Sequence, residues 1–212
     1  HPNAKERVGA FYFWLFPNTM FNFYTVGLSP TLGLAVAPTD FFRSAAADAL
    51  RGPLARLFRG VPPTRFQSWI EALANAVSCQ QLSLTVGIGL LNRLTDRYGS
   101  GGHIGLRAFP TAEVLASAAT TDLRRLGYST RKAEVLVALA KNVTEGELRL
   151  DELAGAEDAI VLAHLCALKG LGRWSPEHIL PRDFGRLHVF PGHDVGAPDQ
   201  LGPWPPLPEP LD

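Results

Sequence analysis

Two apolar helical stretches separated by a pair of glycines, with an aspartate further along, constrain the fold of this chain most. Residues 165–174 read Leu-Cys-Ala-Leu-Lys-Gly-Leu-Gly-Arg-Trp, and Asp194 follows 22 positions after Gly172. The apolar run stops at Lys169, so the Gly-x-Gly pair predicts a tight hairpin, with a second helix after Arg173. Glycine has no Cβ, so backbone amides in such a turn can approach another molecule closely. The amino end of the second helix also suits a phosphate oxygen.

Three further blocks surround this hairpin. They are residues 66–83 (Phe-Gln-Ser-Trp-Ile-Glu-Ala-Leu-Ala-Asn-Ala-Val-Ser-Cys-Gln-Gln-Leu-Ser), 126–133 (Leu-Gly-Tyr-Ser-Thr-Arg-Lys-Ala) and 190–197 (Phe-Pro-Gly-His-Asp-Val-Gly-Ala). With these blocks in this order, residues from about 54 to 197 resemble the helix-hairpin-helix superfamily of DNA base-excision glycosylases, and most of all its 3-methyladenine (alkylpurine) branch. A Leu-x-Gly-x-Gly turn alone is weak, because turns of that composition are common.

The expected fold class is all-α. Apolar periodicity and glycine breaks predict helices near 69–78, 84–97, 112–118, 121–126, 131–144 and 157–168. The resemblance implies a helical DNA glycosylase domain over 40–197, with its helix-hairpin-helix at 157–180. Residues 1–39 read as an irregular, aromatic-rich N-terminal extension. Residues 198–212 hold six prolines and predict a Pro-rich tail that cannot form a helix.

The first 30 residues differ in character from the rest of the chain. Their aromatic run over 11–24 resembles a short piece of the catalytic domain of Rieske-type non-haem iron oxygenases, without identifiable iron ligands. No oxygenase activity is therefore implied. We interpret the segment as a fusion or a gene-model artefact, with a genuine extension as the alternative.

Charge and cysteine content bound the function only loosely. The chain has 20 basic and 20 acidic residues, and a zero net charge argues mildly against a nucleic-acid partner. A local basic cluster near the hairpin offsets that argument; its members are Lys169, Arg173, Arg182 and Arg186. Cys79 and Cys166 are expected to be buried small apolar residues, and two cysteines cannot hold the four-cysteine iron–sulfur cluster of some relatives.

No apolar run approaches 18 residues, so no membrane partner is expected. The location expected is the bacterial cytoplasm, in association with the nucleoid, and the protein is expected to be a monomer.

The hairpin is the predicted grip on DNA. The resemblance implies phosphate contacts by the backbone around Gly170, Gly172 and Ser175, beside the charges of Lys169 and Arg173. It also matches the backbone carbonyls of Cys166, Leu168 and Gly170 to positions where relatives can coordinate a monovalent cation. No cofactor is then required, and a structural Na⁺ or K⁺ is the only ion expected. The alternative is a helix–helix turn that binds nothing.

A second predicted contact is the Gln80–Ser83 turn, which matches the family loop that enters the minor groove. Gln80 and Gln81 are the predicted DNA-binding residues there, and Gln81 matches the side chain that fills the gap left by a flipped base. A polar turn between two helices is the alternative.

Trp174 and His178 are the predicted walls of the base pocket. Bifunctional relatives carry a lysine nucleophile where this chain has Trp174, and tryptophan cannot form a Schiff base. An indole can instead stack on the cationic ring of an alkylated purine, a contact worth about 2 kcal/mol when desolvated. Packing in the core is the alternative for this residue. His178 stands where relatives commonly have tyrosine.

Asp194 is the predicted catalytic residue. A cationic base leaves without a general acid, so one carboxylate can stabilise the oxocarbenium ion and act as general base for water. An aspartate in a helix cap or turn is the alternative. A metal site from His178, His188, His193 and Asp194 fits no usual zinc spacing.

The function expected is that of a monofunctional DNA-3-methyladenine glycosylase in base-excision repair. It hydrolyses the N-glycosidic bond of 3-methyladenine or 7-methylguanine in duplex DNA and leaves an abasic site. The rival is a catalytically inactive helix-hairpin-helix fragment that only binds DNA. An oxygenase fragment and a bifunctional lyase are weaker alternatives.

Overall fold

The computed structural model describes residues 39–46, 48, 51–57, 59, 65–101, 107–186 and 188–189. Residues 1–38, the Pro-rich tail at 198–212 and the predicted catalytic Asp194 lie outside the described residues. The domain boundaries predicted there therefore stay predictions.

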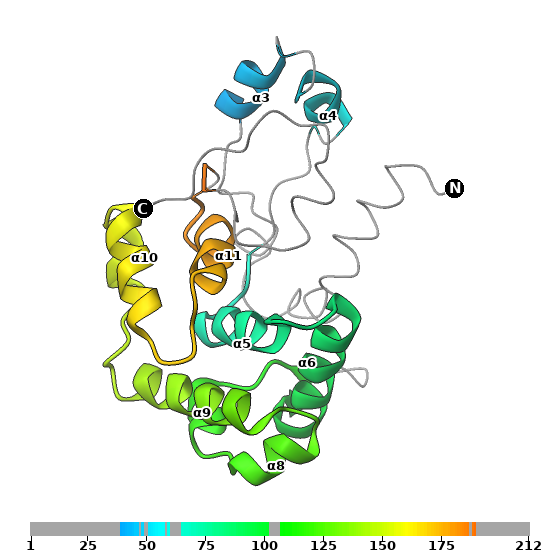
Figure 1. The fold of residues 1–212 in the computed structure, drawn as a ribbon, viewed down its shortest axis with the longest axis vertical. Coiled ribbons are helices and arrows are strands. Elements are labelled where there is room, and N and C mark those ends of the chain that lie inside the picture. The colour runs from blue at the N-terminus through cyan, green and yellow to red at the C-terminus, as the bar shows by residue number, and fades with distance from the viewer. Residues whose placement is uncertain are drawn as a thin grey trace.

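The described part of the chain is helical, as expected for an all-α fold (Figure 1). Its α-helices are α3 (Thr39–Ala46), α4 (Arg51–Leu57), α5 (Trp69–Cys79), α6 (Leu84–Tyr98), α7 (Ala112–Ala116), α8 (Thr120–Arg125), α9 (Thr130–Thr144), α10 (Asp158–Ala167) and α11 (Trp174–Asp183). A 3₁₀ turn, η3 (Glu152–Gly155), precedes α10. The predicted bounds from residue 69 to 168 differ from these by one or two residues.

A small strand pair was not predicted from the sequence. β1 (Ser100–Gly101) and β2 (Arg107–Ala108) pair antiparallel, with Ser100 opposite Ala108. Strands of two residues are too short to show an alternating pattern, so the sequence carries no signal for them.

Helix α5 is the central element of the fold. Every residue from Ile70 to Ser78 is buried, so this helix has no solvent face. Its Leu73 and Val77 belong to one apolar cluster with α10 and α11, whereas Ile70 and Ala74 belong to a second cluster with α6, α7 and α8. Helix α5 is therefore packed between the two apolar clusters.

Helix α9 also serves both clusters. Its Val135 and Leu139 lie in the first cluster and its Leu136 in the second. Neighbouring helices therefore cover two faces of α9, which leaves it wedged beside α5 (Figure 1).

A cap fixes the beginning of α5. The Ser68 side chain accepts the backbone N–H of Glu71, which is one of the two hydrogen bonds of a capping box. The Glu71 carboxylate accepts the N–H of Gln67, one residue before the cap. Burial raises the pKa of Glu71 to about 7, more than this backbone hydrogen bond lowers it.

The expectation for the cysteines is wrong in one case. Both thiols are free, and Cys79 is partly buried, but Cys166 is exposed on α10. The apolar cluster takes Val161 and Leu165 from this helix, and Cys166 falls on the opposite face. Among the described helices, none has the length and apolarity needed to cross a membrane.

Candidate nucleic-acid interface and active site

The predicted hairpin is present between α10 and α11. Two backbone hydrogen bonds close it, from Leu171 N to Leu168 O at 3.1 Å and from Ser175 N to Gly172 O at 3.0 Å. The helix α11 that follows packs on both α10 and α5 (Figure 1). The side chains of Leu171 and Ile179 anchor the hairpin in the first apolar cluster, so the turn sits on a rigid base.

The two glycines of the hairpin differ in their surroundings. Gly170 has φ +90°, and a Cβ there would lie 2.2 Å from Cγ2 of Val135 on α9. Gly172 faces open space, since no described atom lies within 4 Å of a Cβ placed on it. Internal packing therefore requires Gly170, whereas Gly172 leaves room for a molecule outside the protein.

The other residues of the hairpin that were predicted to bind DNA are also partly exposed and partly buried. Lys169 and Gly172 are exposed, and a phosphate can reach both. Ser175 is fully buried and its N–H is used by Gly172 O, so the predicted DNA contact by Ser175 does not match its placement. It closes the turn instead.

Arg173 is tied to an acid that the sequence analysis did not single out. Its Nε lies 3.3 Å from Oε1 of Glu177, whose side chain is 2% exposed. An arginine one turn before a glutamate is a common helical pair and gave no reason to expect burial. The Arg173 guanidinium thus pairs with the buried carboxylate of Glu177 at the point where the hairpin ends.

The carbonyls matched to a cation site already have protein partners in two cases. Leu168 O accepts the N–H of Leu171, and Gly170 O accepts Nε2 of Gln80 at 3.0 Å. A carbonyl oxygen has two lone pairs, so each keeps one for a hard cation. The donor set therefore fits Na⁺ or K⁺, and the cation stays a prediction.

The turn between α5 and α6 projects from the domain beside the hairpin. Gln81 is exposed and has φ +54°, a left-handed conformation unusual for a residue other than glycine. Leu82 follows it with 41% of its surface exposed. Gln80, by contrast, points inward, and its Nε2 lies 2.7 Å from Ser175 Oγ.

Trp174 and His178, the predicted walls of the base pocket, stack on each other. Their ring centroids lie 5.0 Å apart with 19° between the planes, and both side chains are partly exposed. Arg182 Nη1 lies 2.8 Å from His178 Nε2, so this nitrogen accepts the hydrogen bond. Burial, and secondly the Arg182 charge, hold the pKa of His178 well below its usual range. The imidazole is therefore neutral at neutral pH.

The segment after α11 is anchored to the beginning of α10. Asp158 pairs with Arg186 at 3.3 Å and with His188. Arg186 also donates to the carbonyls of Ala154 and Ala156. These contacts hold Arg186 and His188 against the beginning of α10. No sequence pattern indicated Asp158, because its partners lie about 30 residues away.

His178 and His188 have different partners, Arg182 and Asp158. In the part of the chain that the structure describes, no group of three or more metal-ligating side chains occurs. His193, like Asp194, lies outside the described residues.

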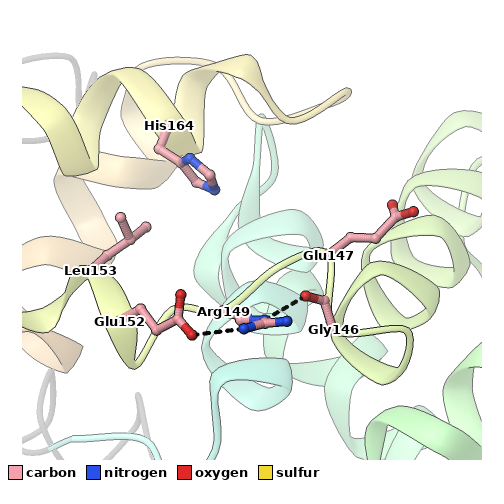
Figure 2. Close-up of a pocket in the computed structure, with 6 residues that line it drawn as sticks. All are labelled: Gly146, Glu147, Arg149, Glu152, Leu153 and His164. Atoms are coloured by element: carbon pink, nitrogen blue, oxygen red, sulfur yellow. Dashed lines mark hydrogen bonds and ion pairs between the residues drawn. The ribbon is translucent and has the colours of Figure 1, made fainter.

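A shallow depression elsewhere is unrelated to these residues. Figure 2 shows its lining, in which Arg149 pairs with Glu152 below His164. Its volume is about 340 Å³, and the other lining residues are Gly146, Glu147 and Leu153. Acidic and basic groups are mixed there, and no predicted site residue contributes.

The chain matches a family model described as the HhH-GPD superfamily of base excision DNA repair proteins, over residues 74–198. The match covers more than half of the chain, which therefore belongs to this superfamily. Its predicted hairpin, Trp174 and Asp194 all fall inside the matched region.

Individual relatives agree with this assignment. The DNA-3-methyladenine glycosylase of Bacillus subtilis is 27% identical over 161 residues, which cover 74% of this chain and 53% of that protein. The structure of a 3-methyladenine DNA glycosylase from Archaeoglobus fulgidus is similar with a TM-score of 0.68 and 28% identity, over 92% of this chain and 62% of that one.

A third relative was solved with DNA. The 3-methyladenine DNA glycosylase of Schizosaccharomyces pombe in complex with abasic DNA has a TM-score of 0.59 and 26% identity, over 71% of this chain and 72% of that one. This chain spans about half the length of the curated relatives it matches.

Proposed function

We propose that this chain excises alkylated purines, such as 3-methyladenine and 7-methylguanine, from duplex DNA. The observation that carries the proposal is the Trp174–His178 stack, which lies directly after a hairpin with an open glycine. The family assignment and the names of the relatives support it.

The proposed reaction has three parts: binding of the DNA backbone, recognition of the damaged base and hydrolysis of the glycosidic bond. Gly172 and Lys169 hold the DNA backbone, and Gln81 enters the space of the flipped base. The neutral aromatic pair of Trp174 and His178 offers a π-face to a cationic purine, whereas a protonated imidazole would repel it. The low pKa of His178 keeps the imidazole from adding a second positive charge to that of Arg182, which donates a hydrogen bond to it.

Hydrolysis is assigned to Asp194 on its sequence spacing. The carboxylate stabilises the oxocarbenium ion as the neutral base departs, and it takes a proton from the attacking water. The products are the free base and an abasic site.

We further propose that the enzyme is monofunctional. A lyase needs an amine that forms a Schiff base with the sugar, and Trp174 occupies the place of that amine in bifunctional relatives. Borohydride should therefore trap no covalent complex with DNA. A trapped complex would show that another amine acts, and that the enzyme is a lyase.

The competing proposal is a DNA-binding module without turnover, in which the open Gly172 and the exposed Lys169 contact a duplex. The two are separated by incubating the chain with methylated duplex DNA and measuring free base by chromatography. An enzyme releases 3-methyladenine or 7-methylguanine and leaves strands that break only on heating in alkali. Duplex binding without base release would establish the binding module.

A further inference from the structure

Contacts from two other parts of the fold hold the turn that presents Gln81. Lys132, in the first turn of α9, places Nζ 3.0 Å from Ser78 O and 2.7 Å from Gln80 O. Gln80 then reaches the hairpin, with Nε2 3.0 Å from Gly170 O and 2.7 Å from Ser175 Oγ. A continuous chain of hydrogen bonds therefore links α9, the α5–α6 turn and the hairpin.

The position of Lys132 suits the end of α5. The last carbonyls of a helix have no partner within the helix, and they carry the negative end of its dipole. An ammonium that donates to two of them makes charge-assisted hydrogen bonds. The side chain is partly buried, and desolvation lowers the pKa of Lys132, so the fold holds this charge here at a cost.

The bond to Gln80 O bears directly on Gln81. That oxygen belongs to the peptide group that also contains the nitrogen of Gln81, and peptide groups are planar. Fixing the carbonyl therefore fixes the plane from which φ of Gln81 is measured. The left-handed conformation of Gln81 is unfavourable for an L-residue, so it needs such an external constraint.

We propose that Lys132 and Gln80 are a positioning pair that sets the Gln81 turn at a fixed distance and orientation from the Gly170–Ser175 hairpin. Both DNA contacts can then engage the same damaged strand without rearrangement. Gln80 acts in this pair through the protein interior and not through DNA. The inference rests on the proposed function, because it assigns the two linked elements to one bound duplex.

The first test removes the ammonium while keeping the length of the side chain. Lys132→Met should bind a duplex with a tetrahydrofuran abasic analogue about tenfold more weakly, since two charge-assisted bonds are lost. Binding to undamaged duplex should change little, because the hairpin remains. A 2-aminopurine placed beside the analogue should also show less of the fluorescence increase that accompanies unstacking.

Two variants control this test. Lys132→Arg keeps donors near both carbonyls and should restore most of the lost affinity. Lys141→Met removes one exposed positive charge from the same helix and should behave as the unmodified chain. Equal affinity and equal fluorescence for Lys132→Met and Lys141→Met would overturn the proposal.

A second measurement needs no DNA. In hydrogen exchange of the free protein, Lys132→Met should speed exchange both in residues 79–83 and in residues 170–175. Faster exchange in 79–83 alone would contradict the link to the hairpin. If Lys132→Met does not fold, Gln80→Met gives the same readout, because it breaks the chain of hydrogen bonds at its other end.

The result is independent of the proposed function. A chain that binds no DNA at all would refute that function, while the exchange data would still decide whether the Gln81 turn and the hairpin are coupled.

Discussion

Trp174 begins α11 and carries the largest part of the proposed recognition. Its indole stacks on a neutral His178 at 5.0 Å and leaves part of its surface exposed, as a wall for a flipped base requires. Tryptophan cannot form a Schiff base, so in the proposed function this side chain bears on both the substrate and the type of reaction.

Removing the indole should therefore affect charged bases most. Trp174→Ala should lower the excision of 7-methylguanine about 30-fold, the equivalent of about 2 kcal/mol of cation–π energy. Trp174→Phe should keep part of the rate. Single-turnover kinetics with a neutral base, hypoxanthine, serve as the comparison. An equal loss for neutral and cationic bases would show that the indole acts through packing alone.

The two hairpin glycines allow a matched pair of substitutions. Gly170→Ala should destabilise the fold by about 3 kcal/mol, because a Cβ meets Val135 and φ is +90°. Gly172→Ala should leave the thermal midpoint nearly unchanged and weaken duplex binding. Calorimetry and fluorescence anisotropy on both variants check this contrast. A stable Gly170→Ala protein would contradict the packing described for the hairpin.

Glu71 predicts how stability depends on pH. Its pKa is about 7 in the fold and near 4.5 in the unfolded chain, so between these values the folded protein binds more protons. Stability should therefore fall as pH rises from about 4.5 to 7, with a contribution of about 2–3 kcal/mol from this group. Asp183, whose pKa burial raises to about 7, acts in the same direction.

The matching substitution is Glu71→Gln, which keeps an acceptor for the N–H of Gln67. Urea unfolding at pH 5 and pH 8 should show a gain of about 2 kcal/mol at pH 8 and little change at pH 5. Glu134→Gln, an exposed site on α9, is the control and should show neither effect. A loss of stability at pH 8 in Glu71→Gln would contradict the burial argument.

At the scale of elements, α5 and α9 support both of the proposed contacts with DNA. The end of α5 forms the Gln81 turn, and Val135 of α9 packs against Gly170 in the hairpin. Each of these helices lies in both apolar clusters, so their ends have little freedom to move. The Gln81 turn and the hairpin therefore sit on rigid supports.

The hairpin carbonyls lead to a prediction about salt. At constant ionic strength, replacing K⁺ by tetramethylammonium should weaken duplex binding, since the organic cation is too large for a carbonyl site at 166–170. Counterion release is common to all monovalent salts and cannot produce this difference. Anisotropy titrations with K⁺, Na⁺ and tetramethylammonium make the comparison. Identical affinities in the three salts would exclude a structural cation.

The helices could be predicted from the sequence because their signals are local. Apolar spacing, the Ser68 cap and the breaks at Gly99 and Gly127 lie within a few residues of the helices they define. Trp174 and His178 were predicted from the family resemblance, whereas their stacking on each other was not predicted.

What the sequence did not predict depends on contacts between distant residues. The clash that fixes Gly170 involves Val135, and the inward turn of Gln80 depends on Ser175, 95 residues away. The pairing of Asp158 with Arg186 and His188 spans about 30 residues. No local pattern encodes which of these residues meet.

At the scale of the whole molecule, the described helices bring the hairpin, the Trp174–His178 stack and the Gln81 turn into one helical domain. The hairpin and the Gln81 turn come from segments some 90 residues apart, and Gln80 joins them. In the proposed function, both elements contact one bound duplex.

The most direct test of this account compares the chain with its Asp194→Asn variant on methylated duplex DNA, measuring free base and duplex affinity together. We expect the unmodified chain to release 3-methyladenine or 7-methylguanine. The rate of base release by the variant should be lower by at least about a hundredfold, while its affinity for duplex DNA stays the same. Equal release by both proteins would contradict the catalytic role of Asp194. Binding without release by either would contradict the enzyme itself.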